Sequence, residues 1–265
     1  MLRELLENLL EYLLTNDTLR NIVKQLAGKA NLVENKKYCR LISPENVVLS
    51  GPFTGMKYPK LKAIGSVLFP KILGSYEDEL HPVIEQLCSD KDIATIYDIG
   101  CAEGYYAIGF AKRLPNAKVW AFDTDDKAKR LCTNMAIANN VADKVSVEHF
   151  CSAETLANTD FKKRSLVISD CEGYEIELFT PKSVANLKNA YVLIELHDCF
   201  NDNISKTILP LFKDTHQYKL IKSRRGKKFE DYSILTSRKL KVNDQLLSER
   251  LEVIMYWAFL SPNQY

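Results

Sequence analysis

The chain has 265 residues, of which 46% are hydrophobic and 26% charged, enough apolar material for one sizeable core and an extension. The formal net charge of +2 argues against a general nucleic-acid-binding surface and against an acidic tail. Seven cysteines, odd in number and without a C-x-x-C pair, predict reduced thiols and a cytoplasmic protein. The longest apolar runs, of about seven residues, are broken by charges, so neither a membrane span nor a membrane partner is expected.

Residues 1–75 are predicted to form an N-terminal helical and loop extension. Leucines spaced by three and four from Leu2 to Leu14 indicate an amphipathic helix, and a second helix is expected from Asp17 to Leu26. Glutamates in the first of these helices disfavour a signal peptide and a membrane-surface helix. We expect the two helices to pack on the main domain or on a second subunit, which would make a homodimer.

A dense stretch of glycine, proline and aromatic residues follows at 51–59, after a short strand expected at 46–50. Such a composition is typical of a shaped loop. The stretch is expected to be an ordered connector or a flap over a binding site. A helix is then predicted from Ser75 to about Cys88, with Pro82 in its early turns.

The stretch from Ile96 to Asp125, with the apolar run that leads into it from Ile93, organises the rest of the chain. An apolar run, 93–99, ends in a glycine turn, a helical pattern follows to Leu114, and a second apolar run, 119–122, ends at Asp123. Strand, glycine turn, helix, strand and acid in this order predict the first βαβ unit of an open α/β sheet.

Alternating strands and helices continue to the end of the chain. After a helix at 125–139, strands are expected at 145–150, 165–169, 190–196, 216–222 and 253–260, with a helix at 204–212. This alternation predicts a mostly parallel, doubly wound, Rossmann-like sheet for residues 76–265. Ligands of such sheets bind beyond the carboxyl ends of the strands, where the acids of this sequence gather.

The glycine turn favours S-adenosylmethionine as the cofactor. Instead of G-x-G-x-x-G, the turn has Gly100 and Gly104 with Ala102 between them, Asp98 before them and Glu103 within. Two carboxylates would repel a pyrophosphate, but they would attract a sulfonium and an ammonium group. Asp123, at the end of the next strand, is placed to accept hydrogen bonds from ribose hydroxyls.

Two motifs carry a resemblance to a known family. The pattern Asp98-x-Gly100-x-Ala102-x-Gly104 resembles motif I of class I methyltransferases, with Ala102 in place of the usual middle glycine. The segment 170–175, DCEGYE, resembles the D-x-E-G-x-E motif of FkbM-type methyltransferases. The resemblance covers roughly residues 76–198 and implies an S-adenosylmethionine site. With the glycine turn, the cofactor-binding residues it implies are Glu77, Asp98, Gly100, Cys101, Ala102, Glu103, Gly104, Asp123, Thr124, Ser152, Ala153 and Asp170.

Candidate catalytic residues are His197, Asp170 and Glu172, which follow the fourth and fifth predicted strands. An imidazole in this position could take a proton from an acceptor hydroxyl near neutral pH. The same residues with Glu195 could instead hold a hard divalent cation, but their spacing matches no known metal signature. We therefore expect O-methylation of a small metabolite or sugar, without a metal in the first instance.

Two other functions stay open from the sequence. One is an NAD-dependent oxidoreductase on a Rossmann sheet, against which the acidic turn argues. The other is a non-catalytic protein that binds the cofactor. A basic run at 222–228 is expected to be a solvated turn or a site for an anionic acceptor, and a nucleic-acid partner is not expected because no aromatic residues are interleaved in it.

Overall fold

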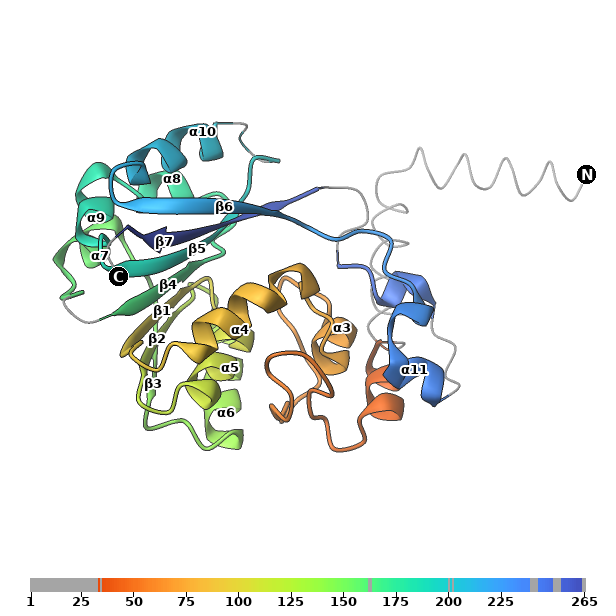
Figure 1. Cartoon of the computed structure of the whole chain (residues 1–265). Helices are drawn as coiled ribbons and strands as arrows, with labels where there is room; N and C mark the ends of the chain where they lie inside the picture. Colours follow the sequence, from red (N-terminus) through yellow and green to blue (C-terminus); the bar gives the residue numbers. More distant parts are fainter. Residues whose placement is uncertain are drawn as a thin grey trace, which may run out of the picture.

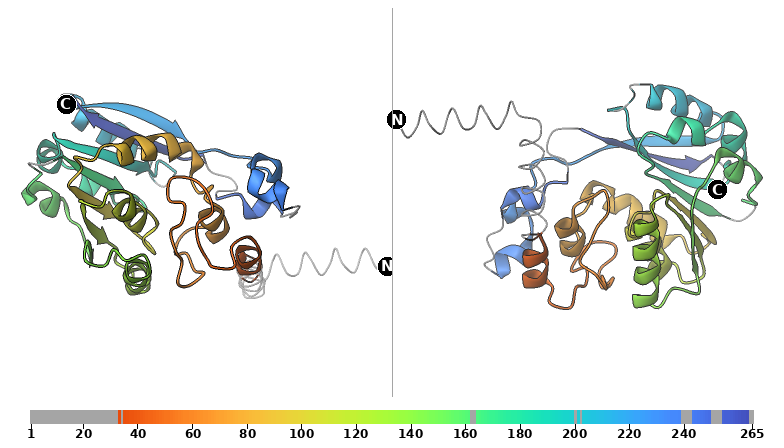
Figure 2. Two further views of the ribbon diagram at one scale, coloured as in Figure 1. Left: turned by 60° about the horizontal axis from the view of Figure 1, so that its bottom comes forward. Right: turned by 180° about the vertical axis from the view of Figure 1, so that it is seen from behind.

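The computed structural model describes residues 33, 35–161, 164–199, 201, 203–238, 243–249 and 254–263. The helices expected at 2–14 and 17–26 lie outside these residues. The homodimer that these helices suggest therefore stays a prediction. Within the described part, one sheet carries helices on both faces, and residues 35–74 lie beside one of these helical layers (Figures 1 and 2).

Seven strands form the sheet in the order β3-β2-β1-β4-β5-β7-β6. Every neighbouring pair from β3 to β5 is parallel, and β7 is antiparallel to both β5 and β6. This is the arrangement of a class I methyltransferase sheet, so the predicted fold class is confirmed. The strands are β1 (Thr95–Ile99), β2 (Lys118–Phe122), β3 (Val145–Glu148), β4 (Ser165–Ser169), β5 (Ala190–Leu196), β6 (His216–Lys222) and β7 (Tyr256–Pro262).

Helices cover the two faces of the sheet (Figure 1). One face carries α4 (His81–Ser89), α5 (Tyr105–Arg113) and α6 (Asp126–Ala138). The other carries α7 (Ala153–Asn158), α8 (Glu175–Leu178), α9 (Pro181–Asn186) and α10 (Ile204–Ile208). Shorter elements are α3 (Leu68–Leu73), α11 (Ser233–Ser237) and the 3₁₀ turns η1 (Asp78–Leu80), η2 (Leu209–Phe212), η3 (Phe229–Asp231) and η4 (Asp244–Leu246).

The central strands β1, β4 and β5 are buried on both faces, because successive side chains point to opposite sides and helices cover both. Ile96 packs in the core beneath α4, α5 and α6, whereas its neighbour Tyr97 packs in the core beneath α7 to α10. Leu193 and Ile194 of β5 divide between the two cores in the same way. This double burial explains why these strands read as continuous apolar runs.

The segment between 33 and 75 contributes to the same core as α4 and α5. The expected strand at 46–50 does not form, because only Val47 pairs, with Lys57 in an isolated bridge. The stretch at 51–59 is ordered and packs Phe53 against α5, where a Cβ on Gly109 would lie 2.5 Å from the Phe53 ring. A glycine in the middle of α5 is therefore needed to seat this aromatic ring.

Most of the other predicted boundaries agree with the structure. The predicted helix at 204–212 is divided into α10 and η2, with Pro210 in the second piece. The last strand occupies 256–262 rather than 253–260, and residues 250–253 lie outside the described part. Among the described residues, no helix combines the length and the apolar character needed to cross a bilayer.

Candidate functional site

A cavity of about 740 Å³ opens at the carboxyl ends of the parallel strands. Many of its lining residues directly follow strands. One wall comes from residues 64–67 of the N-terminal segment. Chain parts that are distant in the sequence therefore meet here. The lining residues that follow strands are Gly100, Cys101 and Ala102 after β1, Asp123 and Thr124 after β2, His149, Phe150 and Cys151 after β3, Asp170, Cys171, Glu172 and Tyr174 after β4, and His197 and Cys199 after β5.

Gly100 is required by a close approach between two strand ends. It has a φ of +85°, and a Cβ on it would lie 1.7 Å from the carbonyl oxygen of Asp170. The amides of Gly100 and Cys101 both donate to the carbonyl oxygen of Phe122, each at 2.9 Å. The turn after β1 is thus tied to β2 and pressed against β4, which explains the glycine without any reference to a ligand.

Ala102 and Asp123 are joined across the floor of the cavity. The Ala102 amide donates to Oδ2 of Asp123 at 2.9 Å, and the Asp125 amide donates to Oδ1 at 2.8 Å. Ala102 has a φ of +49°, a conformation that glycine adopts more easily and that costs an alanine about 1 kcal/mol or more. The acid at the end of β2 is therefore held in one orientation, with lone pairs left for a ligand.

The two carboxylates that flank the glycines do not line the cavity. Asp98 is buried and accepts a hydrogen bond from the Ala107 amide at 2.8 Å, at the start of α5. Burial raises the pKa of Asp98 to about 7, and the nearby carboxylates of Asp170 and Asp123 add to this rise. Asp98 thus ties the turn to the helix that follows it.

Glu103 belongs to a buried ion pair. It is 1% exposed and lies 2.7 Å from Nζ of Lys71, which is 3% exposed. The hydroxyl of Tyr58 and the amide of Ile64 donate to the same carboxylate at 3.2 and 3.0 Å. Lys71 also donates to the Ser66 hydroxyl at 2.7 Å. Glu103 therefore anchors the N-terminal wall of the cavity to α5, and its predicted contact with the cofactor stays a prediction.

The other predicted cofactor residues divide between the cavity wall and positions behind it. Thr124 and Asp170 line the cavity, whereas Gly104, Glu77, Ser152 and Ala153 do not. Glu77 is buried with a φ of +46° and accepts a hydrogen bond from the Tyr106 hydroxyl. Ser152 caps α7 by accepting from the Thr155 amide at 3.1 Å. These residues shape the wall from behind.

Aromatic residues that were not among the predicted site residues also line the cavity. The rings of Phe150 and Tyr174 lie 5.4 Å apart, although Phe150 is 48% exposed. On the opposite wall, Tyr76 and Tyr105 pack edge to face at 5.2 Å. Phe150 ends a predicted strand and Tyr174 lies inside the second motif, so their positions were available in the sequence, but their meeting was not.

His197 is surrounded by four carboxylates. Its Nδ1 lies 2.5 Å from Oε1 of Glu175, which is completely buried. Its Nε2 lies 3.5 Å from Asp170, 3.6 Å from Glu172 and 3.5 Å from Glu195. The three predicted catalytic residues, which come from the ends of β4 and β5, are thus brought together at one wall of the cavity. One ligand atom from each of them lies within 4.8 Å of the other two.

The buried imidazole is more basic than a free one. Burial alone lowers the pKa of His197, but the hydrogen bond and the charge of Glu175, together with the charges of Asp170 and Glu172, raise it above its ordinary value. In turn, burial raises the pKa of Glu175, but His197 outweighs this effect and the pKa falls below its ordinary value. The pair is therefore a carboxylate beside an imidazole that readily holds a proton.

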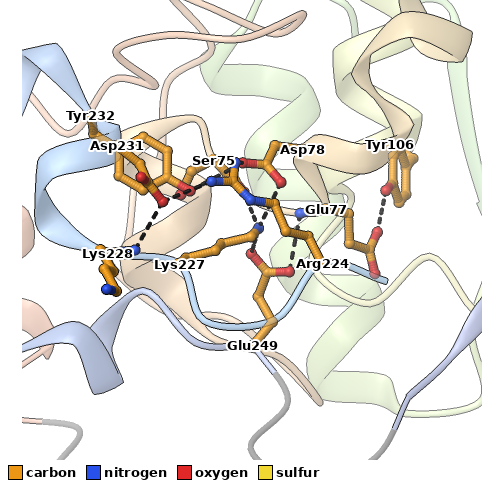
Figure 3. A network of polar contacts seen from close by, with 10 residues as sticks. All are labelled: Ser75, Glu77, Asp78, Tyr106, Arg224, Lys227, Lys228, Asp231, Tyr232 and Glu249. Atoms are coloured by element: carbon orange, nitrogen blue, oxygen red, sulfur yellow. Dashed lines mark hydrogen bonds and ion pairs between the residues drawn. The ribbon is translucent and has the colours of Figure 1, made fainter. Parts of the chain in front are cut away.

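Two side chains of the basic run at 222–228 form ion pairs with acids of other segments. Lys227, buried at 2% exposure, lies 2.7 Å from Glu249 and 3.2 Å from Asp78 (Figure 3). Arg224 pairs with Asp78 at 3.0 Å and with Asp231 at 2.7 Å. Lys227 is committed to internal partners, so the predicted site for an anionic acceptor receives no support from it.

The ion pair of Lys227 also involves an acid, Glu249, that lines the cavity and was not predicted from the sequence. Glu249 lines the cavity, accepts from the Glu77 amide at 3.2 Å, and has its pKa raised by burial to about 7 despite the charge of Lys227. No local pattern around Glu249 signals this position. Its place depends on a contact between residues that are 172 positions apart.

No protein-family model matches the sequence, and no curated relative matches it. Among solved structures, the chain is similar to the precorrin-6y C5,15-methyltransferase of Geobacter metallireducens, with 12% identity and a TM-score of 0.46 over 68% of this chain and 87% of that one. It is also similar to the O-methyltransferase TomG of Streptomyces achromogenes in complex with S-adenosylmethionine, with 13% identity and a TM-score of 0.46 over 71% and 81% of the two chains.

Proposed function

We propose that the chain is an S-adenosylmethionine-dependent methyltransferase of the FkbM type that methylates a hydroxyl oxygen of a small metabolite or sugar. One observation carries this proposal. The glycine turn and Asp123 lie in the same cavity as His197, Asp170 and Glu172. The parts expected of a cofactor site and the parts expected of an acceptor site are thus joined on one sheet edge.

The charges around the cavity favour a cationic cofactor. Asp123, Asp170, Glu172 and Glu195 line the cavity, and Lys71, which lines it too, is paired with Glu103. A pyrophosphate would meet an excess of carboxylates here, whereas the sulfonium and ammonium groups of S-adenosylmethionine would be attracted. An NAD-dependent oxidoreductase is therefore the weaker alternative.

The proposed reaction is an in-line displacement. A C–O bond forms between the acceptor oxygen and the methyl carbon, the C–S bond breaks with its electron pair going to sulfur, and S-adenosylhomocysteine leaves. The hydroxyl proton must also be removed, and the cluster of His197, Asp170 and Glu172 is the group placed to promote this step. Alignment of the two substrates in the cavity supplies the rest.

The test is calorimetric titration of the protein with S-adenosylhomocysteine and, separately, with NAD. Saturable binding of the first, at least tenfold tighter than that of the second, is expected. Asp123→Ala should weaken it, whereas Asp143→Ala, which removes an exposed acid just before β3, should not. Tighter binding of NAD would favour the oxidoreductase instead.

A screen of hydroxylated metabolites with methyl-labelled cofactor follows. Transfer of label to a hydroxyl supports the enzyme, and binding without transfer to any acceptor would favour the non-catalytic alternative. The small-molecule acceptor, the cytoplasmic location and a homodimer through the N-terminal helices belong to the same proposal.

A further inference from the structure

We propose that Asp170, Glu172 and His197 bind a divalent cation of the Mn²⁺ or Mg²⁺ class at the acceptor wall of the cavity. The site itself follows from the geometry of these side chains, and its part in methyl transfer rests on the proposed function. Ligand atoms of the three residues lie within 4.8 Å of one another. All three residues line the cavity, so an ion held by them would face a bound acceptor.

The spacing around Nε2 of His197 is close to that of ligands that share one ion. The distances to Asp170 and Glu172, 3.5 and 3.6 Å, exceed those of hydrogen bonds. An octahedral ion with bonds of about 2.1 Å places adjacent ligands about 3 Å apart. Glu172 is 67% exposed, so a small rotation of its side chain can close the remaining gap.

The imidazole is oriented from behind. Glu175, completely buried, holds Nδ1 of His197 at 2.5 Å, so that Nε2 points toward Asp170, Glu172 and Glu195. A histidine that ligates a metal through one ring nitrogen commonly has the other nitrogen bonded to a carboxylate in this way. The contact fixes the ring and increases its basicity toward a cation.

A second observation points independently to a missing partner. Oδ1 of Asp170 is shielded from solvent and accepts no hydrogen bond within the described part of the chain, although it is the oxygen nearest to Nε2 of His197 on that residue. A shielded carboxylate oxygen without a donor loses its hydration, and the imidazole at 3.5 Å compensates for this loss only in part. A cation at the centre of the cluster would supply the compensation.

The charge balance agrees. Four carboxylates, those of Asp170, Glu172, Glu175 and Glu195, lie within 3.6 Å of one imidazole, so acidic groups outnumber basic ones in this cluster. Two of these carboxylates, Glu175 and Glu195, are at most 1% exposed. A divalent ion reduces this excess at low dielectric, where repulsion between carboxylates is strongest.

The oxygen-rich ligand set indicates the kind of ion. Carboxylates suit Mg²⁺ and Mn²⁺, and one imidazole moves the preference toward Mn²⁺. An acceptor hydroxyl on the cavity side of the ion would lose its proton to water more readily, because the cation stabilises the alkoxide. In this form of the reaction His197 is a ligand rather than the base.

The experiment measures Mn²⁺ binding to the purified full chain, by the electron paramagnetic resonance signal of free Mn²⁺, without cofactor or acceptor. One saturable site per chain is expected. Asp170→Asn and Glu172→Gln should each weaken it at least tenfold, and Mn²⁺ should raise the melting temperature of the wild type more than that of either variant. The control is Glu148→Gln, which removes an exposed acid at the end of β3 and should leave Mn²⁺ affinity unchanged.

Absence of a saturable site, or equal affinity in the wild type and Glu172→Gln, would overturn the proposal. Glu172 is exposed, so this variant remains informative even if Asp170→Asn does not fold. Titration of the same samples with S-adenosylhomocysteine separates the two claims. If the protein binds S-adenosylhomocysteine but not Mn²⁺, the cation site is refuted and the proposed function is not. If it binds Mn²⁺ but not S-adenosylhomocysteine, the proposed function is refuted and the cation site is not.

Discussion

The buried pair of Lys71 and Glu103 offers the sharpest test of how the cavity is built. The sequence indicates that Glu103 contacts the cofactor, whereas the structure surrounds it with protein donors. Lys71→Met keeps the length of the side chain and removes its charge. Among the described residues, Tyr58 and Ile64 would then be the remaining donors to the carboxylate of Glu103, at 3.2 and 3.0 Å.

The expected cost is large because both partners are buried, at 3% and 1% exposure. Removal of one member of such a pair typically lowers the free energy of unfolding by about 3–5 kcal/mol, since the other charge is left without compensation. That is a substantial part of a total stability of about 5–15 kcal/mol. Adding Glu103→Gln removes the orphaned charge, so the double variant should be more stable than Lys71→Met alone.

The assay is urea unfolding followed by circular dichroism, with S-adenosylhomocysteine affinity measured on the same proteins. Glu85→Gln is the matched control. Glu85 is 51% exposed and its partner Arg113 is 34% exposed, so their ion pair should contribute at most about 1 kcal/mol to the free energy of unfolding. A loss below about 1 kcal/mol in Lys71→Met would refute the reasoning. So would a Glu103→Gln variant of unchanged stability that no longer binds the nucleoside, since that result would make Glu103 a cofactor ligand.

Four further predictions follow from the site. Asp123→Ala should weaken S-adenosylhomocysteine binding by about 1.5–3 kcal/mol in calorimetry, and unchanged affinity in the folded variant would remove Asp123 from the site. Gly100→Val should lower the melting temperature and abolish nucleoside binding, because its Cβ would lie 1.7 Å from the carbonyl oxygen of Asp170; a variant like the wild type would contradict this contact. His197→Ala should lower turnover by about 10²–10⁴-fold with little change in nucleoside affinity, and full turnover would exclude both of its suggested roles. The pKa of Asp98 is raised to about 7, so its contribution to stability is fully present below its ordinary pKa of 3.8 and is lost as the pH rises through 7. Asp98→Asn should therefore flatten the fall in unfolding free energy between pH 4 and pH 7. Parallel pH curves of the variant and the wild type would contradict the raised pKa.

The sequence by itself determined the sheet and the position of the site along the chain. The strands at 165–169 and 190–196 were predicted residue for residue, because apolar runs bounded by polar residues are a local signal, and the bounds of the more polar strand at 216–222 agree as well. The glycine turn after β1 is also a local signal, because the chain can turn there only where a positive φ is tolerated. The acid after β2 is a local signal because it directly follows an apolar run. Parallel strands place their carboxyl ends on one edge, so the meeting of Asp170 and His197 could be predicted as well.

Tertiary structure decided which way the acids point and what they meet. Asp98 and Glu103 lie beside the same glycines in the sequence. Asp98 accepts a hydrogen bond from α5, whereas Glu103 pairs with Lys71, 32 positions away. Glu249 reaches the cavity because Lys227 holds it there. Local periodicity assigns a residue to a face or a turn, but the partner of a buried charge is selected by desolvation and pairing between distant segments, and that selection exists only in the folded chain.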